Sequence, residues 1–403
     1  MQNGQLSPMT KRMTEKSDKT ESTALSPAPI STDVEGPSSM IVRPAPASAR
    51  PPLSTREVFL DTEAYFRLGH DLSKAPILSL FEHVAEGRLR LHITDLTLRE
   101  ILRQITETAE KDVAALKAAR GALKRWRSRA PKAAGSKPVK PLALDGAAIG
   151  AEAFAEFDRT LVRHGVIKHD ASTRAAQPIF QAYFRREPPF DGAKSKEFPD
   201  AFALAALGEW CETNGATMYV VGGDKAMRRA VEAHSSLIGV EDLQDLLARA
   251  TIAHSPNVEQ AVSRIVAMPA FAASLGDAID EGIDTLEVMY WGDLAEGEAS
   301  DPQRAGPPQD IDWTVISASR GSYGVIIECQ VRILARLDFE DRSMAMYDRE
   351  DGVFIGAQSS HTEIEEDVPL RLFVQTDDKG AITSSEMLTF EMALRGEDEF
   401  PYD

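Results

Sequence analysis

Short strand-like segments separated by helical patterns repeat along residues 57–248: two are apolar runs, and Leu89–Ile93 alternates apolar and basic residues. Val58–Leu60, Leu89–Ile93 and Met218–Val221 have the length and composition of strands. Apolar residues at helical spacing follow them at Ile77, Leu78, Leu80, Phe81 and Val84, at Leu98, Ile101, Leu102 and Ile105, and through Ala226–Ala233. Because strands that alternate with helices build parallel sheets, the pattern predicts an α/β fold whose parallel sheet is flanked by helices.

The periodicity changes after Leu286. Val325–Ala335 alternates along its length, and Leu370–Gln375 and Met387–Met392 show a similar period of two. This period is typical of antiparallel strands with one buried face. We therefore expect a small antiparallel β-domain at the C-terminal end of the chain.

Composition divides the chain further. Residues 1–52 contain 8 of the 23 prolines and few aliphatic side chains, so they cannot bury enough apolar surface to become ordered. The predicted parts are a disordered tail at 1–52, an α/β domain at 53–250 with a basic helical insertion at about 111–190, a helical connector at 251–284 and an acidic β-rich domain at 285–403.

The formal net charge of −18 is distributed unevenly. Residues 251–403 carry 31 acidic and 10 basic side chains, whereas residues 1–250 carry 32 acidic and 35 basic ones. A strongly acidic protein ordinarily repels phosphates. The near-neutral N-terminal part is nevertheless compatible with a nucleic-acid partner.

Cysteine usage and hydropathy bear on the compartment. Cys211 and Cys329 lie one in each half of the chain, which argues against a disulfide framework and favours a reducing compartment. No apolar run reaches the roughly 18–20 residues of a membrane span. We therefore expect a cytoplasmic protein without a membrane partner.

Four acidic side chains occupy equivalent places in the strand and helix pattern. Asp61 ends the first strand, Glu100 lies one turn into the helix after the second, Asp200 opens a later helix, and Asp224 follows the last strand. Open α/β sheets bind ligands at the carboxyl ends of their strands. Converging carboxylates suit Mg²⁺ or Mn²⁺, so the pattern predicts metal-assisted hydrolysis of a phosphodiester.

Each acid also has a purely structural interpretation. Thr97-x-x-Glu100 matches a capping box, Asp200 is a favourable acid in a first helical turn, and Asp61 and Asp224 fit N-cap positions. Spacing alone does not choose between helix capping and metal binding.

The sequences around these acids resemble the motifs of the PIN domain family. Val58–Thr62 resembles the opening strand of that family, Thr97–Ile101 its second acidic motif, Phe198–Ala205 its third and Val220–Met227 its fourth, in the same order. The similarity covers roughly residues 57–248 and is greatest to a PIN-like subgroup of bacterial proteins. It implies a Mg²⁺- or Mn²⁺-dependent nuclease, usually acting on RNA, whose catalytic and metal-binding residues are Asp61, Glu100, Asp200 and Asp224.

Two features depart from the family pattern. Glu63 stands where Asn or Ser commonly follows Asp-Thr, so it adds a carboxylate or alters how Thr62 orients the site. The 100 positions from Glu100 to Asp200 exceed what a minimal PIN domain needs, which is why we interpret the basic segment and the helices after it as an insertion.

Basic residues are concentrated between Lys111 and Lys140, where 10 basic side chains accompany one acid. They suit phosphate contacts, and Trp126 offers a stacking surface. An exposed solubilising helix explains the same pattern equally well. Asp191 is a candidate for an additional site acid. The predicted substrate-binding residues are Thr62, Lys225, Lys194, Lys196, Arg120, Lys124, Arg125 and Arg127.

The sequence thus favours an endoribonuclease that cuts single-stranded RNA. The alternative is a non-catalytic PIN-like module that binds nucleic acid or protein and has a regulatory role. A phosphatase of the Asp-x-Asp type fits less well, because Asp61-Thr62-Glu63 lacks the second Asp. For the acidic β-domain, a homodimer contact, an inhibitory protein partner and the masking of the basic segment all remain open.

Overall fold

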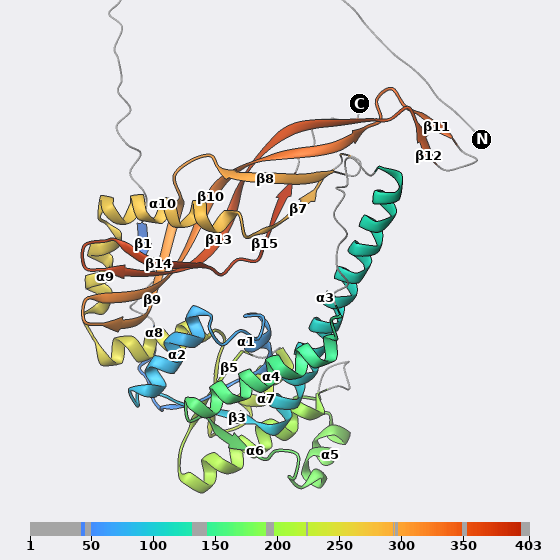
Figure 1. Cartoon of the computed structure of the whole chain (residues 1–403). Coiled ribbons are helices and arrows are strands. Elements are labelled where there is room, and N and C mark those ends of the chain that lie inside the picture. The colour runs from blue at the N-terminus through green and yellow to red at the C-terminus, as the bar shows by residue number, and fades with distance from the viewer. Residues whose placement is uncertain are drawn as a thin grey trace, which may run out of the picture. The chain divides into compact units, whose positions relative to one another are not determined.

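A five-stranded parallel sheet forms the centre of the N-terminal half in the computed structural model of the chain (Figure 1). The strand order is β4-β3-β2-β5-β6, and every neighbouring pair is parallel, which confirms the predicted sheet. The strands are β2 (Glu57–Leu60), β3 (Arg90–Thr94), β4 (Ile167–His169), β5 (Met218–Val221) and β6 (Leu237–Val240). The structure describes residues 42–44, 50–130, 143–190, 197–222, 225–292, 294, 297–348 and 353–395.

Helices cover both faces of this sheet. Alternate residues of β2 enter different cores: Val58 and Leu60 pack in a cluster with residues of α2 and α8, whereas Phe59 packs with residues of α6 and α7. A central strand buried on both faces is a continuous apolar run, as this one is. The helices are α1 (Thr62–Phe66), α2 (Ala75–Ala85), α3 (Asp95–Arg129), α4 (Gly146–Arg163), α5 (Ala176–Arg185), α6 (Phe198–Asn214), α7 (Lys225–Glu232) and α8 (Leu243–His254).

The segment expected as an insertion contains an edge strand of the sheet. β4 lies within residues 111–190 and pairs in parallel with β3, from His92 opposite Ile167 to Thr94 opposite His169. Three residues are too few to show an alternating pattern. The basic part of the segment belongs to α3, which continues without a break for 35 residues.

An antiparallel sheet dominates the C-terminal half, as predicted. Its order is β1-β9-β10-β13-β14, and β8 also pairs with β10. β1 is parallel to β9, and β15 is parallel to β7. The strands are β1 (Val42–Pro44), β7 (Glu287–Trp291), β8 (Glu298–Arg304), β9 (Gln309–Ser319), β10 (Ser322–Asp341), β11 (Met346–Asp348), β12 (Val353–Ile355), β13 (Gln358–Asp377), β14 (Ile382–Met387) and β15 (Glu391–Arg395).

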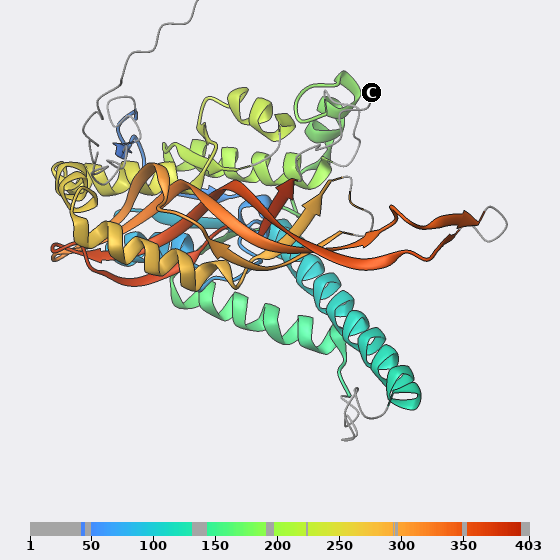
Figure 2. The same cartoon turned by 90° about the horizontal axis from the view of Figure 1, so that it is seen from above.

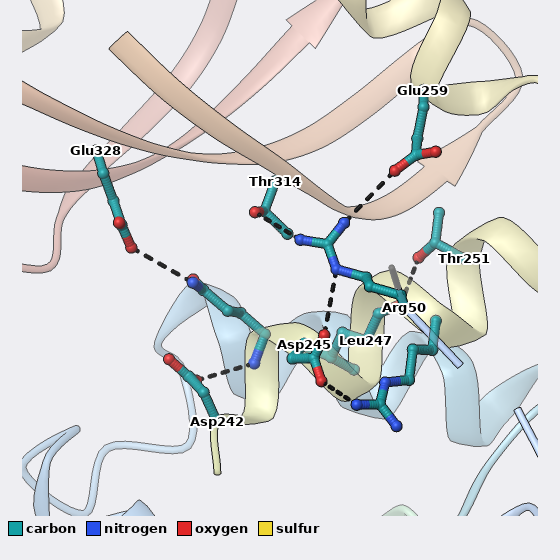
Figure 3. Close-up of polar contacts among 10 residues, drawn as sticks. Arg50, Asp242, Asp245, Leu247, Thr251, Glu259, Thr314 and Glu328 are labelled. Atoms are coloured by element: carbon teal, nitrogen blue, oxygen red, sulfur yellow. Dashed lines mark hydrogen bonds and ion pairs between the residues drawn. The ribbon is translucent and has the colours of Figure 1, made fainter. Parts of the chain in front are cut away.

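The expected tail contributes two described pieces to this architecture. β1 adds a strand at the edge of the antiparallel sheet, and Arg50 joins three elements. Arg50 donates to Asp245 of α8 at 3.2 Å, to Thr314 of β9 at 3.2 Å and to Glu259 at 3.4 Å (Figure 3). The rest of the predicted tail up to residue 49 lies outside the described residues.

Two helices cover the antiparallel sheet. α9 (Val258–Val266) and α10 (Pro269–Ile283) bury one face each in a core that includes residues of β9, β10 and β13. Within the described parts of the chain, no single helix is long and apolar enough to span a membrane, and α9 and α10 reach that length and composition only as a pair bent by 78°.

The antiparallel sheet also packs against the parallel half. Ile316, Ile326 and Phe373 belong to the same buried cluster as Leu246 and Leu247 of α8. Ion pairs surround this apolar junction: Arg371 of β13 lies 3.1 Å from Asp242 and 3.3 Å from Glu328.

Candidate active site

Asp61 lies directly after β2, at the carboxyl end of the central strand. Its backbone N–H donates to the carbonyl of Val221 at 3.0 Å, which extends the pairing of β2 with β5 by one residue. Gly222 follows with φ +86°, and a Cβ built there would lie 3.8 Å from Cβ of Asp61. The chain that leaves β5 therefore passes beside Asp61. Asp61 occupies the N-cap position of α1 without a side-chain capping hydrogen bond, so its carboxylate is available to a ligand.

Glu100 lies near the start of α3 and is held by the end of β2. The N-cap of α3 is Thr94, whose side chain accepts from the backbone N–H of Thr97 at 3.1 Å. The capping box proposed for Thr97 and Glu100 is therefore wrong, because the helix begins one turn earlier. Glu100 instead accepts a hydrogen bond from the hydroxyl of buried Thr62 at 3.1 Å, and Arg103 lies 3.6 Å from its other oxygen.

Asp200 lies in the first turn of α6, which begins at Phe198 and contains Pro199 in that same turn. A hydrogen bond joins it to Glu197, the N-cap residue of α6. Glu197 was not among the residues predicted from sequence. The available signal was its position three residues before Asp200, which places both side chains on the same side of a helix.

The carboxylates are close enough for their charges to interact. Burial is the largest cause that raises the pKa of Asp200, and together with the charge of Asp61, the hydrogen bond and charge of Glu197 and the charge of Glu100 it brings that pKa to about 8. Burial also raises the pKa of Asp61 to about 6, because the nearby backbone N–H groups of Thr62 and Glu63 only partly oppose it. Three predicted site acids thus converge from three different elements.

A comparison with protein families identifies this part of the chain. The model of the family described as PIN domain matches residues 58–227, which contain Asp61, Glu100 and Asp200. Residues 58–227 are a PIN domain. The family is commonly associated with nuclease activity, and its members typically bind Mg²⁺ or Mn²⁺. No curated protein matched the chain, and no solved structure matched it.

The donors of the PIN domain fit a hard divalent cation. Asp61, Glu100 and Asp200 supply only carboxylate oxygens, and their mutual repulsion is relieved by bound positive charge. In the described ranges no group of three His, Cys, Asp or Glu side chains has metal-binding geometry. The fourth predicted ligand, Asp224, lies outside the described residues, as do Asp191, Lys194 and Lys196.

Glu63 and Lys225 lie near the ends of the strands that carry the site. Glu63 forms an ion pair with Arg67 one turn later in the chain, at 2.6 Å, and its charge still contributes to the raised pKa of Asp61. Lys225 is the first residue of α7 and is exposed.

The predicted substrate contacts on α3 lie far along that helix from the PIN domain carboxylates. With a rise of about 1.5 Å per residue, Arg120 is about 30 Å from Glu100 along the helix axis, and Arg127 is about 40 Å away. The structure thus gathers the acids but does not bring Arg120, Lys124, Arg125 and Arg127 to them.

Proposed function

We propose that the PIN domain is a Mg²⁺- or Mn²⁺-dependent endonuclease that hydrolyses single-stranded RNA. The observation that carries the proposal is the convergence of Asp61, Glu100 and Asp200 at the carboxyl ends of the central strands. Asp61, Glu100 and Asp200 are partly buried, and like charges held together away from water are costly to a fold. A cluster of them is explained by a cation that binds there, and the choice of RNA rests on the resemblance to the PIN family.

In this proposal, the cation is held by Asp61, Glu100 and Asp200, with Asp224 as the fourth ligand. When bound, a divalent cation polarises the phosphoryl group and lowers the pKa of an attacking water. The residues of the chain supply position. Thr62 fixes one oxygen of Glu100, and Arg103 lies beside the other. Glu197 is joined to Asp200 by a hydrogen bond, which is one of the causes that raise the pKa of Asp200.

Cleavage of labelled RNA by the purified full chain with Mn²⁺ tests the proposal. We expect Asp61→Asn and Asp200→Asn to reduce the rate by more than about 100-fold, because each removes a proposed metal ligand. Glu152→Gln is the matched control, since it removes one exposed carboxylate on α4 and leaves the site intact. Linearisation of a circular RNA distinguishes internal cleavage from trimming at an end. Equal rates for the parent and Asp61→Asn would exclude the assigned site.

Thermal unfolding with and without Mn²⁺ tests metal binding separately from catalysis. The parent is expected to gain melting temperature with Mn²⁺, because a ligand that binds only the folded state stabilises it. Asp200→Asn is expected to gain less melting temperature from Mn²⁺ than the parent, because it lacks one of the proposed ligands. If Mn²⁺ neither stabilises the parent nor supports cleavage while RNA still binds, the non-catalytic binding module is the better description.

A further inference from the structure

Among the described residues, no element covers the distal part of α3. Val113 is the last buried residue of α3, and none of residues 114–129, all of which the structure describes, is buried. α4 packs against the earlier part, where Gly146 faces Glu110 and Gly150 faces Thr106. Figures 1 and 2 show α3 continuing past this contact. We call residues 114–129 the α3 arm; it is about 24 Å long.

The α3 arm carries an apolar stripe between basic side chains. Leu116, Ala119, Leu123 and Trp126 follow the 3-4-3 spacing that places residues on one face of a helix. Leu116 is 42% exposed, Leu123 37% and Trp126 59%. Residues 111–129 include seven basic side chains and one acid. Because an isolated helix gains little stability in water from propensity alone, an exposed apolar stripe of this kind fits a surface that becomes covered.

A second exposed surface lies at the end of the long strands β10 and β13. β8 pairs with β10 only as far as Asp338, so residues 339–341 and 358–360 pair only with each other before β11 and β12 begin. Figures 1 and 2 show this two-stranded ribbon extending from the antiparallel sheet, with β11 and β12 at its end. We call residues 338–348 and 353–367 the ribbon tip.

The ribbon tip combines exposed apolar side chains with negative charge. Met344 is 91% exposed, Met346 76%, Tyr347 52% and Ile355 58%. The tip as defined includes eight acidic side chains and one basic side chain. The net charge of the ribbon tip is thus opposite in sign to that of the α3 arm. Both surfaces also expose apolar side chains.

We propose that two copies of the chain associate reciprocally, with the α3 arm of each copy lying along the ribbon tip of the other. Opposite charges favour this pairing, whereas two α3 arms side by side would bring like charges together. The ten residues 358–367 of β13 form a continuous strand of about 33 Å, which is longer than the arm. The ribbon of the same copy leaves the stripe exposed, so the cover comes from a second molecule. A two-fold arrangement makes the contact twice.

The molar mass of the full chain over a concentration series, measured by sedimentation or light scattering, tests the proposal. The parent is expected to form a dimer whose dissociation constant rises with salt. Lys124→Glu with Arg125→Glu on the arm, or Met346→Ser with Ile355→Ser on the tip, should each weaken the dimer at least about tenfold. All four side chains are exposed, so folding is preserved. Arg320→Glu with Lys379→Glu is the matched control, because it reverses two exposed basic residues in turns elsewhere and should not change the dimer.

Mixing the two variants identifies the contact itself. An equimolar mixture of the arm variant and the tip variant retains one parent-type contact, between the intact arm of one and the intact tip of the other. The mixture is therefore expected to form more dimer than either variant alone and less than the parent. A parent that stays monomeric, or a dimer unaffected by both variants, overturns the proposal. Arm variants of unchanged mass that lose RNA binding would also overturn it and would assign the arm to nucleic acid.

Discussion

Thr62 shows how one hydroxyl group arranges the candidate site. It follows Asp61 at the end of β2, is buried, and donates to Glu100 on α3. The donor fixes one carboxylate oxygen while Asp61 occupies the adjacent position in the chain. Thr62 therefore acts as a positioning residue that links the first and second acidic motifs.

Replacing Thr62 provides a test at this scale. Thr62→Val removes the donor at nearly constant volume, so Glu100 loses its orientation, and we expect Mn²⁺ affinity or RNA cleavage to fall about 10- to 100-fold. Thr62→Ser retains the hydroxyl and should keep most of the activity. The apparent dissociation constant for Mn²⁺, measured by titration of both variants and the parent, checks the expectation. Equal loss in the Val and Ser variants would show that packing of the methyl group matters instead.

Some residues of the candidate site could be predicted from the sequence and one could not. Asp61, Glu100 and Asp200 were recognised because each stands in a motif next to a strand or helix signal. Glu197 was missed because its position three residues before Asp200 does not by itself distinguish it from a solvated glutamate. Its role depends on Asp200 and on the burial of that carboxyl, and burial is a property of the folded chain.

Among the elements, the crossing of α3 and α4 depends on two glycines. A Cβ at Gly146 would lie 2.6 Å from Cα of Glu110, and one at Gly150 would lie 2.7 Å from Cα of Thr106. Backbone atoms cannot move aside as a flexible side chain can. The close approach anchors the proximal half of α3, from which Glu100 projects, and leaves the α3 arm free of α4.

The two helices offer a matched pair of Gly→Ala substitutions. Gly150→Ala is expected to lower the free energy of unfolding by about 1–3 kcal/mol, because the added methyl group overpacks the crossing. Gly121→Ala lies in the α3 arm, where the nearest atom to the new Cβ is Nη1 of Arg125 at 3.8 Å. It should stabilise the chain by about 0.5–1 kcal/mol through helix propensity. Urea unfolding monitored by circular dichroism measures the free energy of unfolding of both variants. A stabilising effect of Gly150→Ala would contradict the close approach of α3 and α4 at this glycine.

At the scale of the whole molecule, His83 lies where the two halves meet. It is fully buried on α2, and its Nε2–H donates to the carbonyl of Ile316 in β9 at 3.0 Å, with Thr251 of α8 at 3.2 Å. Nδ1 accepts from Arg88 at 3.0 Å. This arrangement suits a neutral ring. Burial lowers the pKa of His83 to about 4, the hydrogen bond to Ile316 opposes that change, and the charges of Arg88 and His254 add to it.

Stability should therefore depend on pH through this junction. Above about pH 6.5 the ring is neutral in both the folded and the unfolded chain, and its stabilising contacts are fully present. As the pH falls from 6.5 towards 4, the unfolded chain binds a proton that the folded chain does not, so the free energy of unfolding drops by on the order of 3 kcal/mol for this group.

Chemical denaturation between pH 7.5 and 4.5 checks this pH dependence. His83→Gln keeps a side-chain N–H donor but cannot titrate. Its free energy of unfolding should therefore fall less than that of the parent as the pH is lowered. His361→Gln, at an exposed position on β13, is the control and should leave the slope unchanged. If the free energy of unfolding changed with pH equally in all three proteins, His83 would not be the source of the pH dependence.

The sequence by itself determined the local features of this protein. Apolar runs identified β2 and β5, alternation identified β3 and the antiparallel region, and motif order identified the PIN domain. These signals depend on contacts between near neighbours in the chain, which periodicity reports directly. The three-residue strand β4 and the strand β1 were beyond that reach, because their pairing is decided by a partner strand far away in sequence.

Only the tertiary structure decided which residues meet. It brought Asp61, Glu100 and Asp200 together with Glu197, and it placed the Thr62 hydroxyl within hydrogen-bond distance of Glu100. It showed that α3 is capped by Thr94, so Thr97 and Glu100 do not form a capping box. It also separated the basic side chains of the α3 arm from the acids by the length of a helix, although sequence composition had grouped them as one substrate site. Proximity in space follows from how helices and strands pack, and a linear pattern carries no direct record of that packing.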